Sequence, residues 1–278
     1  MSSNNTFDTT NISKFIKSEK SYKIFKIKYS NKEKKCIADF NIIKPYVYTS
    51  YNNLDNLEES FKKASNDNDS IKIMVGIVQK LLSKLLKAYN TQYYWIAIRI
   101  KTKNNFFDIP RWHCDSYYFT TRDRLQTKFV TTLKGPATLL LDTTPEEHKY
   151  FFEKSTYDTN LPVNLLEFDI EHRKKLDQSI NSKRIQLNNN QGIIFTAGDF
   201  EKCLIHSEPK EDDNRIFISI LPGTKEEIEE LKNKFENINK ENNNFIKKGG
   251  NIDYYQKYLK YKQKYINLKI AYKPYNYD

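Results

Sequence analysis

The spacing of apolar residues changes along the chain from helical to alternating and then back to helical. Over 71–89 apolar residues recur every three or four positions, which predicts an amphipathic helix that packs on a sheet. A second helix is expected over 54–65, and short β-like runs over 22–29 and 42–48. Residues 1–20 are rich in Ser, Asn and Thr, so we expect them to be disordered.

Between Tyr93 and Leu221 the apolar runs are short and rich in β-branched and aromatic residues. They occupy 93–101, 128–133, 137–142, 192–199, 202–206 and 215–221. Short strands separated by Gly-, Asn- and Asp-containing turns predict a sandwich or barrel. One long helical insertion is expected to interrupt them, at about 143–191, with helical stretches near 145–154 and 167–179.

Helical spacing returns after the last β-like run. Thr224 and Glu227 have the spacing of a capping box, and apolar residues follow at 3-4-3 intervals. Gly249-Gly250 ends this helix, and a second helix rich in Lys and Tyr is expected beyond it. The sequence therefore predicts three parts: a disordered N-terminus (1–20), a barrel domain (21–223) and a helical C-terminal extension (224–278).

The composition of the chain indicates where the protein is located more than what it does. The formal net charge of +11 permits binding to nucleic acid, but no compact Arg-rich patch accompanies it, so solvated lysines account for the charge. The three cysteines lie far apart without a CxxC motif, which indicates reduced thiols. No apolar run approaches the ~18 residues of a membrane span, and the N-terminus has no signal-peptide pattern. We expect a cytoplasmic protein.

Two of the four histidines occur where a metal site can form. His113 and Asp115 make an H-x-D motif in a strand-like segment, so alternation puts both side chains on one face and Cys114 on the other. His206 ends another β-like run, 91 residues after Asp115. Two imidazoles and one carboxylate leave open positions on a metal, as in the facial triad of non-haem Fe(II) oxygenases. We predict a mononuclear metal site from these three residues, which are also the candidate catalytic residues.

A basic residue follows the second histidine at a suggestive distance. Arg215 comes nine residues after His206 and opens a strand, and alternation points Ser219 the same way. Because a guanidinium binds a carboxylate in bidentate fashion, this pair suits the tail of a dicarboxylate.

These motifs resemble the Fe(II)/2-oxoglutarate-dependent oxygenases, whose pattern is H-x-D, a distant His, and a basic residue about ten positions later. The resemblance covers 111–221 and includes the segments KFVTTLKGPATLLLD and GIIFTAGD. It implies an α+β fold with a double-stranded β-helix (jelly-roll, cupin-like) core and supporting N-terminal helices. It also implies Fe(II) on the three predicted ligands and 2-oxoglutarate anchored by Arg215, assisted by Ser219. In relatives with Arg, the Ser commonly stands two residues later, not four.

The implied activity is a dioxygenase that decarboxylates 2-oxoglutarate and hydroxylates or demethylates a protein, nucleic acid, glycan or small molecule. Thr131 and Lys128 face opposite ways on one strand, so either of them is a candidate to reach the co-substrate. We include Thr131 among the residues expected to bind it. Trp112 and the aromatic residues 117–119 either line the substrate pocket or fill the barrel core.

The alternative is a jelly-roll that binds another metal or has no catalysis and serves binding or structure, for example in a virion. His148 and His172 lie among charged residues, and we interpret them as surface positions. The Lys/Tyr-rich C-terminal tail resembles tails on giant DNA virus proteins, which would place the protein in a host cytoplasm or a virion. Such a helix is expected to self-associate, to dock on its own barrel or to bind an anionic partner.

Overall fold

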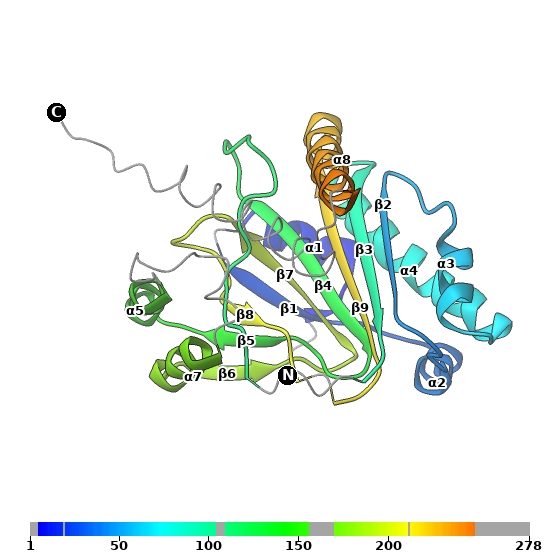
Figure 1. The fold of residues 1–278 in the computed structure, drawn as a ribbon, viewed down its shortest axis with the longest axis horizontal. Helices are drawn as coiled ribbons and strands as arrows, with labels where there is room; N and C mark the ends of the chain where they lie inside the picture. Colours follow the sequence, from blue (N-terminus) through cyan, green and yellow to red (C-terminus); the bar gives the residue numbers. More distant parts are fainter. Residues whose placement is uncertain (1–4, 19, 104–108, 156–169, 211, 248–278) are drawn as a thin grey trace.

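The computed structural model describes residues 5–18, 20–103, 109–155, 170–210 and 212–247. Within these residues two antiparallel sheets pack face to face (Figure 1). The larger sheet has the order β1-β7-β4-β9-β3-β2 and the smaller sheet the order β6-β5-β8. Val130 and Phe195 of the larger sheet pack between the sheets against Leu140 of the smaller one.

From β4 onward the chain passes back and forth between the two sheets. The larger sheet contains β1 (Tyr22–Lys26), β2 (Tyr46–Tyr51), β3 (Tyr93–Lys101), β4 (Gln126–Lys134), β7 (Gln191–Ala197) and β9 (Arg215–Gly223). The smaller sheet contains β5 (Leu139–Asp142), β6 (Lys183–Gln186) and β8 (His206–Ser207). A backbone bridge between His113 and His206 adds one more extended segment beside β8. From β3 to β9 the chain thus winds repeatedly from one sheet to the other, which is the predicted double-stranded β-helix.

The predicted insertion is too long, because it includes a strand of the barrel. β6 lies inside 143–191 and pairs with β5 along its length. The helical part consists of α5 (Pro145–Ser155) and α7 (Ile170–Ser179), close to the two stretches expected. Phe151 of α5 and Leu176 of α7 pack against Leu141 on the smaller sheet. The strand was missed because KRIQ carries only one apolar residue.

The long predicted helix covers the outer face of the larger sheet. α4 (Asn68–Tyr89) places its stripe of buried residues against Ile216, Ile218 and Ile220 of β9. α2 (Asn31–Asp39) and α3 (Leu57–Ala64) pack beside it on the same side (Figure 1). Burying such a stripe removes its apolar surface from water and is the main source of stability for the layer.

The expected disorder of residues 1–20 is wrong for most of that segment. Thr9–Ile16 forms α1, and the side chains of Phe7, Ile12 and Phe15 are at most 3% exposed. Asp8 caps the helix by accepting a hydrogen bond from the backbone N–H of Asn11, at 2.8 Å. The prediction failed because the segment is mostly polar, although its three apolar side chains are buried in the core.

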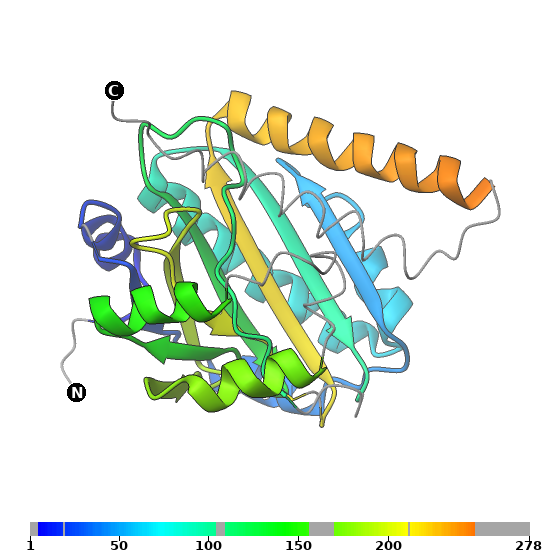
Figure 2. The same cartoon turned by 60° about the vertical axis from the view of Figure 1, so that its left-hand side comes forward.

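α8 (Lys225–Lys247) begins after the predicted capping box, and both hydrogen bonds between Thr224 and Glu227 are present. Figure 2 shows this helix lying across one end of the strands of the larger sheet. Ile228 and Leu231 are buried against a cluster that includes Trp95 of β3. The second helix expected beyond Gly250 lies outside the described residues. In the described part of the chain, no helix combines the length and apolar character that crossing a membrane requires.

Candidate metal centre

The two predicted histidine ligands are brought together by direct backbone pairing. His113 and His206 exchange both N–H to carbonyl hydrogen bonds, each 2.9 Å long. Residues that pair in this way in an antiparallel ladder project their side chains to the same face. The two imidazole centroids are accordingly 4.4 Å apart.

The hydrogen bonds of the imidazoles orient one nitrogen of each ring toward a shared point. Nδ1 of His113 lies 2.8 Å from the carbonyl oxygen of Arg111, and Nδ1 of His206 lies 3.0 Å from that of Leu204. A carbonyl only accepts, so each Nδ1 carries the proton and each Nε2 keeps its lone pair. A metal-binding histidine normally has its second nitrogen held in this way.

Asp115 completes the group from the same face of the segment. One oxygen of its carboxylate lies 3.9 Å from Nε2 of His206, and the three potential ligand atoms all lie within 4.8 Å of one another. The backbone carbonyl of Asp115 accepts a hydrogen bond from Gly198 N–H at 2.8 Å. The donor set of two neutral imidazoles and one carboxylate fits a divalent first-row metal such as Fe(II).

Burial keeps the His206 imidazole in the form that binds a metal. Desolvation lowers the pKa of His206 below 6.5, even though the nearby Asp115 carboxylate acts to raise it. The ring is therefore neutral at pH 7 and its Nε2 is available as a ligand.

Lys128 is the charged side chain that pairs with the Asp115 carboxylate. Its ammonium donates to Asp115 Oδ2 at 2.6 Å and to the hydroxyl of Tyr118 at 2.8 Å. Burial, together with the Asp115 carboxylate, raises the pKa of Tyr118 well above 10, so the phenol stays protonated. The Asp115 oxygen that Lys128 engages, Oδ2, is also the one that lies 3.9 Å from His206 Nε2, and a carboxylate oxygen has two lone pairs with which to accept from Lys128 and bind a metal.

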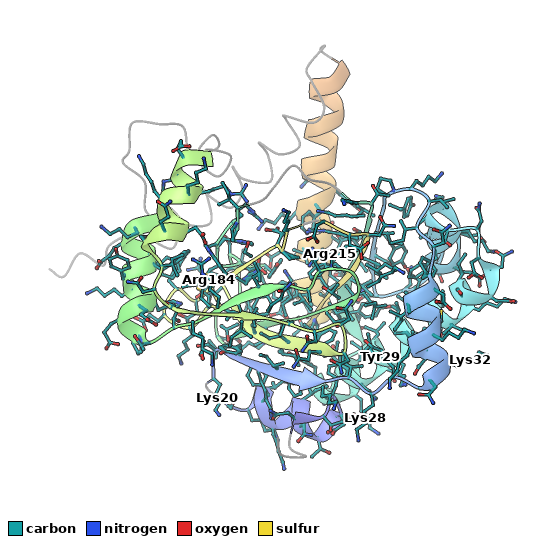
Figure 3. All side chains as sticks on the ribbon, turned by 90° about the horizontal axis from the view of Figure 1, so that it is seen from below. Lys20, Lys28, Tyr29, Lys32, Arg184 and Arg215 are labelled. Atoms are coloured by element: carbon teal, nitrogen blue, oxygen red, sulfur yellow. The ribbon has the colours of Figure 1, made fainter. Side chains whose placement is uncertain are left out.

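The three ligand residues line a cavity of about 620 Å³ between the larger sheet, the smaller sheet and α8. Arg215, Phe217 and Ser219, alternate residues of β9, face into it, as the strand alternation predicted. Arg215 is 4% exposed and its guanidinium lies over the ring of Phe217, 4.7 Å from the centroid. In Figure 3 Arg215 lies in the interior, whereas Lys28 and Lys32 lie at the periphery.

Ser219 is well placed for a polar ligand of the cavity. Its side chain is 3% exposed, and its hydroxyl is buried without a hydrogen-bond partner among the described residues. Because a buried hydroxyl without a partner is costly, the position indicates a group that a bound ligand satisfies.

Thr131 does not line the cavity, and its predicted role is corrected. It lies on the opposite face of β4 from Lys128, and its hydroxyl donates to the carbonyl of Gln191 at 2.8 Å. Of the two candidates on this strand, only Lys128 faces the metal centre. Strand alternation puts Thr131 and Lys128 on opposite faces of β4 but does not say which face meets the cavity. The packing of the helices on one face of the sheet decides this.

The aromatic residues around the H-x-D motif divide between cavity and core. Tyr117 and Tyr118 line the cavity. Trp112 packs beneath the smaller sheet and donates to Asp177 at 2.6 Å, and Phe119 packs with the α8 cluster.

Sequence reasoning missed an ion pair beside the histidines. Arg111 and Glu208, each two residues from a histidine ligand, form a salt bridge of 2.6 Å. Burial alone would raise the pKa of Glu208, but the Arg111 guanidinium beside it holds that pKa well below 4.5. Arg111 Nη2 also lies 3.4 Å from Nε2 of His113. The sequence signal for this ion pair is that each of its members lies two residues from one of the two paired histidines.

α8 also contributes to the cavity, which the division at residue 224 did not anticipate. Leu231, Lys234 and Phe235 line its wall, and Arg99 of β3 lies on the same lining. The sequence predicts this helix only as part of a C-terminal extension separate from the barrel domain. It packs instead on the inner face, since Trp95 points into the cavity.

Three solved structures align with most of this chain. A Kdo hydroxylase, a non-heme Fe(II) alphaketoglutarate dependent dioxygenase crystallised with alphaketoglutarate and Fe(III), aligns over 82% of this chain and 89% of that chain, with 10% identity and a TM-score of 0.41. A prolyl-4-hydroxylase from Pseudomonas putida aligns over 77% and 97%, with 8% identity and a TM-score of 0.36. A rice dioxygenase for auxin oxidation aligns over 78% and 79%, with 5% identity and a TM-score of 0.38.

No protein-family model matches the chain, and no curated protein matches it by sequence.

Proposed function

We propose that the protein is an Fe(II)- and 2-oxoglutarate-dependent dioxygenase, acting as a hydroxylase or demethylase. The observation that carries the proposal is the hydrogen-bonded pairing of His113 with His206, which brings one ring nitrogen of each within 4.8 Å of the Asp115 carboxylate. A structural barrel has no need of such a group in an internal cavity.

Each cavity residue then has a distinct task. Arg215 binds the far carboxylate of 2-oxoglutarate, and Ser219 donates its hydroxyl to the same end. Lys128 holds the Asp115 carboxylate in the orientation that a metal requires. Bound Fe(II), with 2-oxoglutarate and dioxygen, supplies the oxidation of a substrate C–H bond, with release of succinate and CO2.

The walls of the cavity exclude water from the reacting groups. Trp95, Phe235 and Leu231 close the end beneath α8. Removing water strengthens each ionic contact with the co-substrate, because the effective dielectric constant falls.

Turnover of 2-oxoglutarate tests this function. The purified chain, supplied aerobically with Fe(II), 2-oxoglutarate and ascorbate as the reductant, is expected to form succinate even without substrate, slowly and in an uncoupled reaction. His206→Ala should abolish succinate formation, whereas His172→Ala, which lies outside the cavity lining, should not. Equal succinate formation by His206→Ala and the wild type would refute the proposal.

We further propose a location in the cytoplasm, which for a viral protein means the host cytoplasm or the virion. The motivation is the reduced cysteines and the sequence of the tail beyond Gly250. The proposed partners of the tail are a second copy of the chain or an anionic surface. Size-exclusion chromatography of the full chain against a chain ending at Lys248 tests self-association.

A further inference from the structure

A second group of ligand-type side chains lies on the reverse side of the H-x-D segment. Cys114, His148 and Cys203 each offer one ligand atom, and these atoms all lie within 4.8 Å of one another. Since Cys114 stands between His113 and Asp115, alternation turns it away from the metal centre described above. The proposed dioxygenase chemistry uses none of these three residues.

Three separate elements contribute one ligand each. Cys114 belongs to the segment that pairs with β8, His148 belongs to α5, and Cys203 lies just before β8. Residues so far apart in sequence converge here only through the tertiary fold. The grouping therefore differs from a cluster of neighbours on one surface loop.

The imidazole of His148 is held in place by a contact typical of metal-binding histidines. Its Nε2 lies 2.8 Å from the backbone carbonyl oxygen of Cys203. Because the carbonyl must accept, Nε2 carries the proton and Nδ1 retains the lone pair that a metal needs. The sequence had suggested a surface position for His148, and the structure places it half-buried against Cys203.

The surroundings of the cluster are apolar. Cys203 is 2% exposed, and Cys114 packs against the hydrophobic cluster that contains Trp112. The ring of Phe152 lies 5.1 Å from that of His148. An apolar shell limits the access of water to metal–thiolate bonds and favours their retention.

We propose that Cys114, His148 and Cys203 bind a Zn²⁺ ion, with a water molecule in the fourth tetrahedral position, which the partly exposed Cys114 and His148 leave accessible. Two thiolates and one imidazole are ligands that zinc prefers. Zn–S and Zn–N bonds of ~2.3 and ~2.0 Å place tetrahedral ligand atoms roughly 3.5–3.8 Å apart. The ligand atoms of Cys114, His148 and Cys203 now lie within 4.8 Å of one another. Side-chain rotation that shortens these distances by about 1 Å gives the spacing that zinc requires.

A metal at this point would join the elements that present the first metal centre. It would link α5 to both segments that carry the histidine ligands, through Cys114 next to His113 and Cys203 three residues before His206. Zinc here acts as a structural cross-link, and its loss frees the H-x-D segment to move.

Cobalt substitution distinguishes the two sites. The reduced, metal-free full chain is titrated with Co²⁺, because thiolate-bound cobalt has an intense near-ultraviolet charge-transfer absorption that a site with two imidazoles and one carboxylate lacks. The wild type and His206→Ala are both expected to show this band. Cys203→Ser and Cys114→Ser are expected to lose it, whereas Cys36→Ser, a buried cysteine on α2, is expected to keep it.

Native mass spectrometry of the zinc-loaded protein supplies an independent count. The wild type is expected to hold two zinc ions per chain, and Cys203→Ser and His206→Ala one each. Zinc should raise the melting temperature of His206→Ala, which keeps the thiolate site, and should raise that of the double variant with Cys203→Ser much less. Absence of the thiolate band in reduced, folded wild type would overturn the proposal without reference to any variant. Its persistence in both Cys114→Ser and Cys203→Ser would also overturn it.

Discussion

Arg215 is the residue on which binding of a dicarboxylate depends in this account. Its guanidinium is buried at the cavity wall and lies against the ring of Phe217, which restricts the plane it can adopt. A planar group held in this way loses little freedom when it binds a carboxylate.

We expect Arg215→Ala to weaken 2-oxoglutarate binding by about tenfold to over a hundredfold, which corresponds to roughly 1.5–3 kcal/mol for a charge-assisted pair. Arg215→Lys should weaken it less, because the charge remains but the bidentate geometry is lost. The apparent KM for 2-oxoglutarate measures both changes. An unchanged KM in Arg215→Ala would mean that another residue anchors the co-substrate.

We expect His206 to make the stability of the metal-free protein depend on pH. Burial lowers the pKa of His206 in the folded protein, whereas an unfolded histidine titrates near 6.5. Below about pH 6.5 the unfolded state therefore binds the proton more readily, and the free energy of unfolding falls. Metal-free wild type should lose more stability between about pH 7 and pH 5.5 than His206→Gln, as measured by urea unfolding. Equal losses would show that this ring is not held neutral by burial.

The predictability of individual residues follows from strand alternation. It correctly grouped His113 with Asp115 and Arg215 with Ser219, because each pair lies two or four positions apart on an extended segment. It did not settle Thr131, because alternation defines two faces without saying which one meets the helices.

At the scale of elements, one turn connects the barrel framework to the metal centre. Gly198 has φ of +84°, and a Cβ at this position would lie 2.3 Å from the ring of Tyr117. Its N–H donates to the carbonyl of Asp115. The turn after β7 thus supports the ligand segment directly.

Gly198→Ala is therefore expected to lower the free energy of unfolding by about 1–3 kcal/mol and to weaken Fe(II) binding. Gly76→Ala is the matched control, because Gly76 lies within α4 and no atom would contact its Cβ. That change should stabilise the protein by roughly 0.5–1 kcal/mol. Chemical denaturation of both variants makes the comparison, and a stable Gly198→Ala would show that the turn can relax.

Elements with strong periodicity could be predicted, and elements that depend on tertiary contacts could not. α4 and the long strands β3 and β9 carry continuous apolar patterns. β8 has only two residues, and α2 has the polar sequence NKEKKCIAD with a capping box from Ser30 and Glu33. Their conformations depend on neighbouring strands and on the core, which local sequence does not report.

At the scale of the whole molecule, α8 belongs to the barrel although its sequence reads as an extension. Ile228 and Leu231 are fully buried, and Phe235 stacks on Trp95 with an interplanar angle of 12°. The sequence predicted an amphipathic helix but did not indicate the barrel surface on which its apolar face packs. That surface forms only when β3 and β9 pair.

A chain ending at Lys248 is expected to fold and to form succinate as the full chain does, because it retains α8. A chain ending at Thr224 should aggregate or lose activity, because it exposes Trp95 and removes one wall of the cavity. Thermal unfolding and succinate formation of the two shortened chains make the test. Loss of activity in a folded chain ending at Lys248 would place the tail in the active site.

If one cavity binds Fe(II) and 2-oxoglutarate together, anaerobic absorption spectroscopy detects the complex directly. Chelation of Fe(II) by 2-oxoglutarate produces a visible charge-transfer band, which the wild type should show with one iron per triad. The band should be absent in His113→Ala and His206→Ala and should require more 2-oxoglutarate in Arg215→Ala. A wild-type protein that binds Fe(II) but never develops this band would contradict the account.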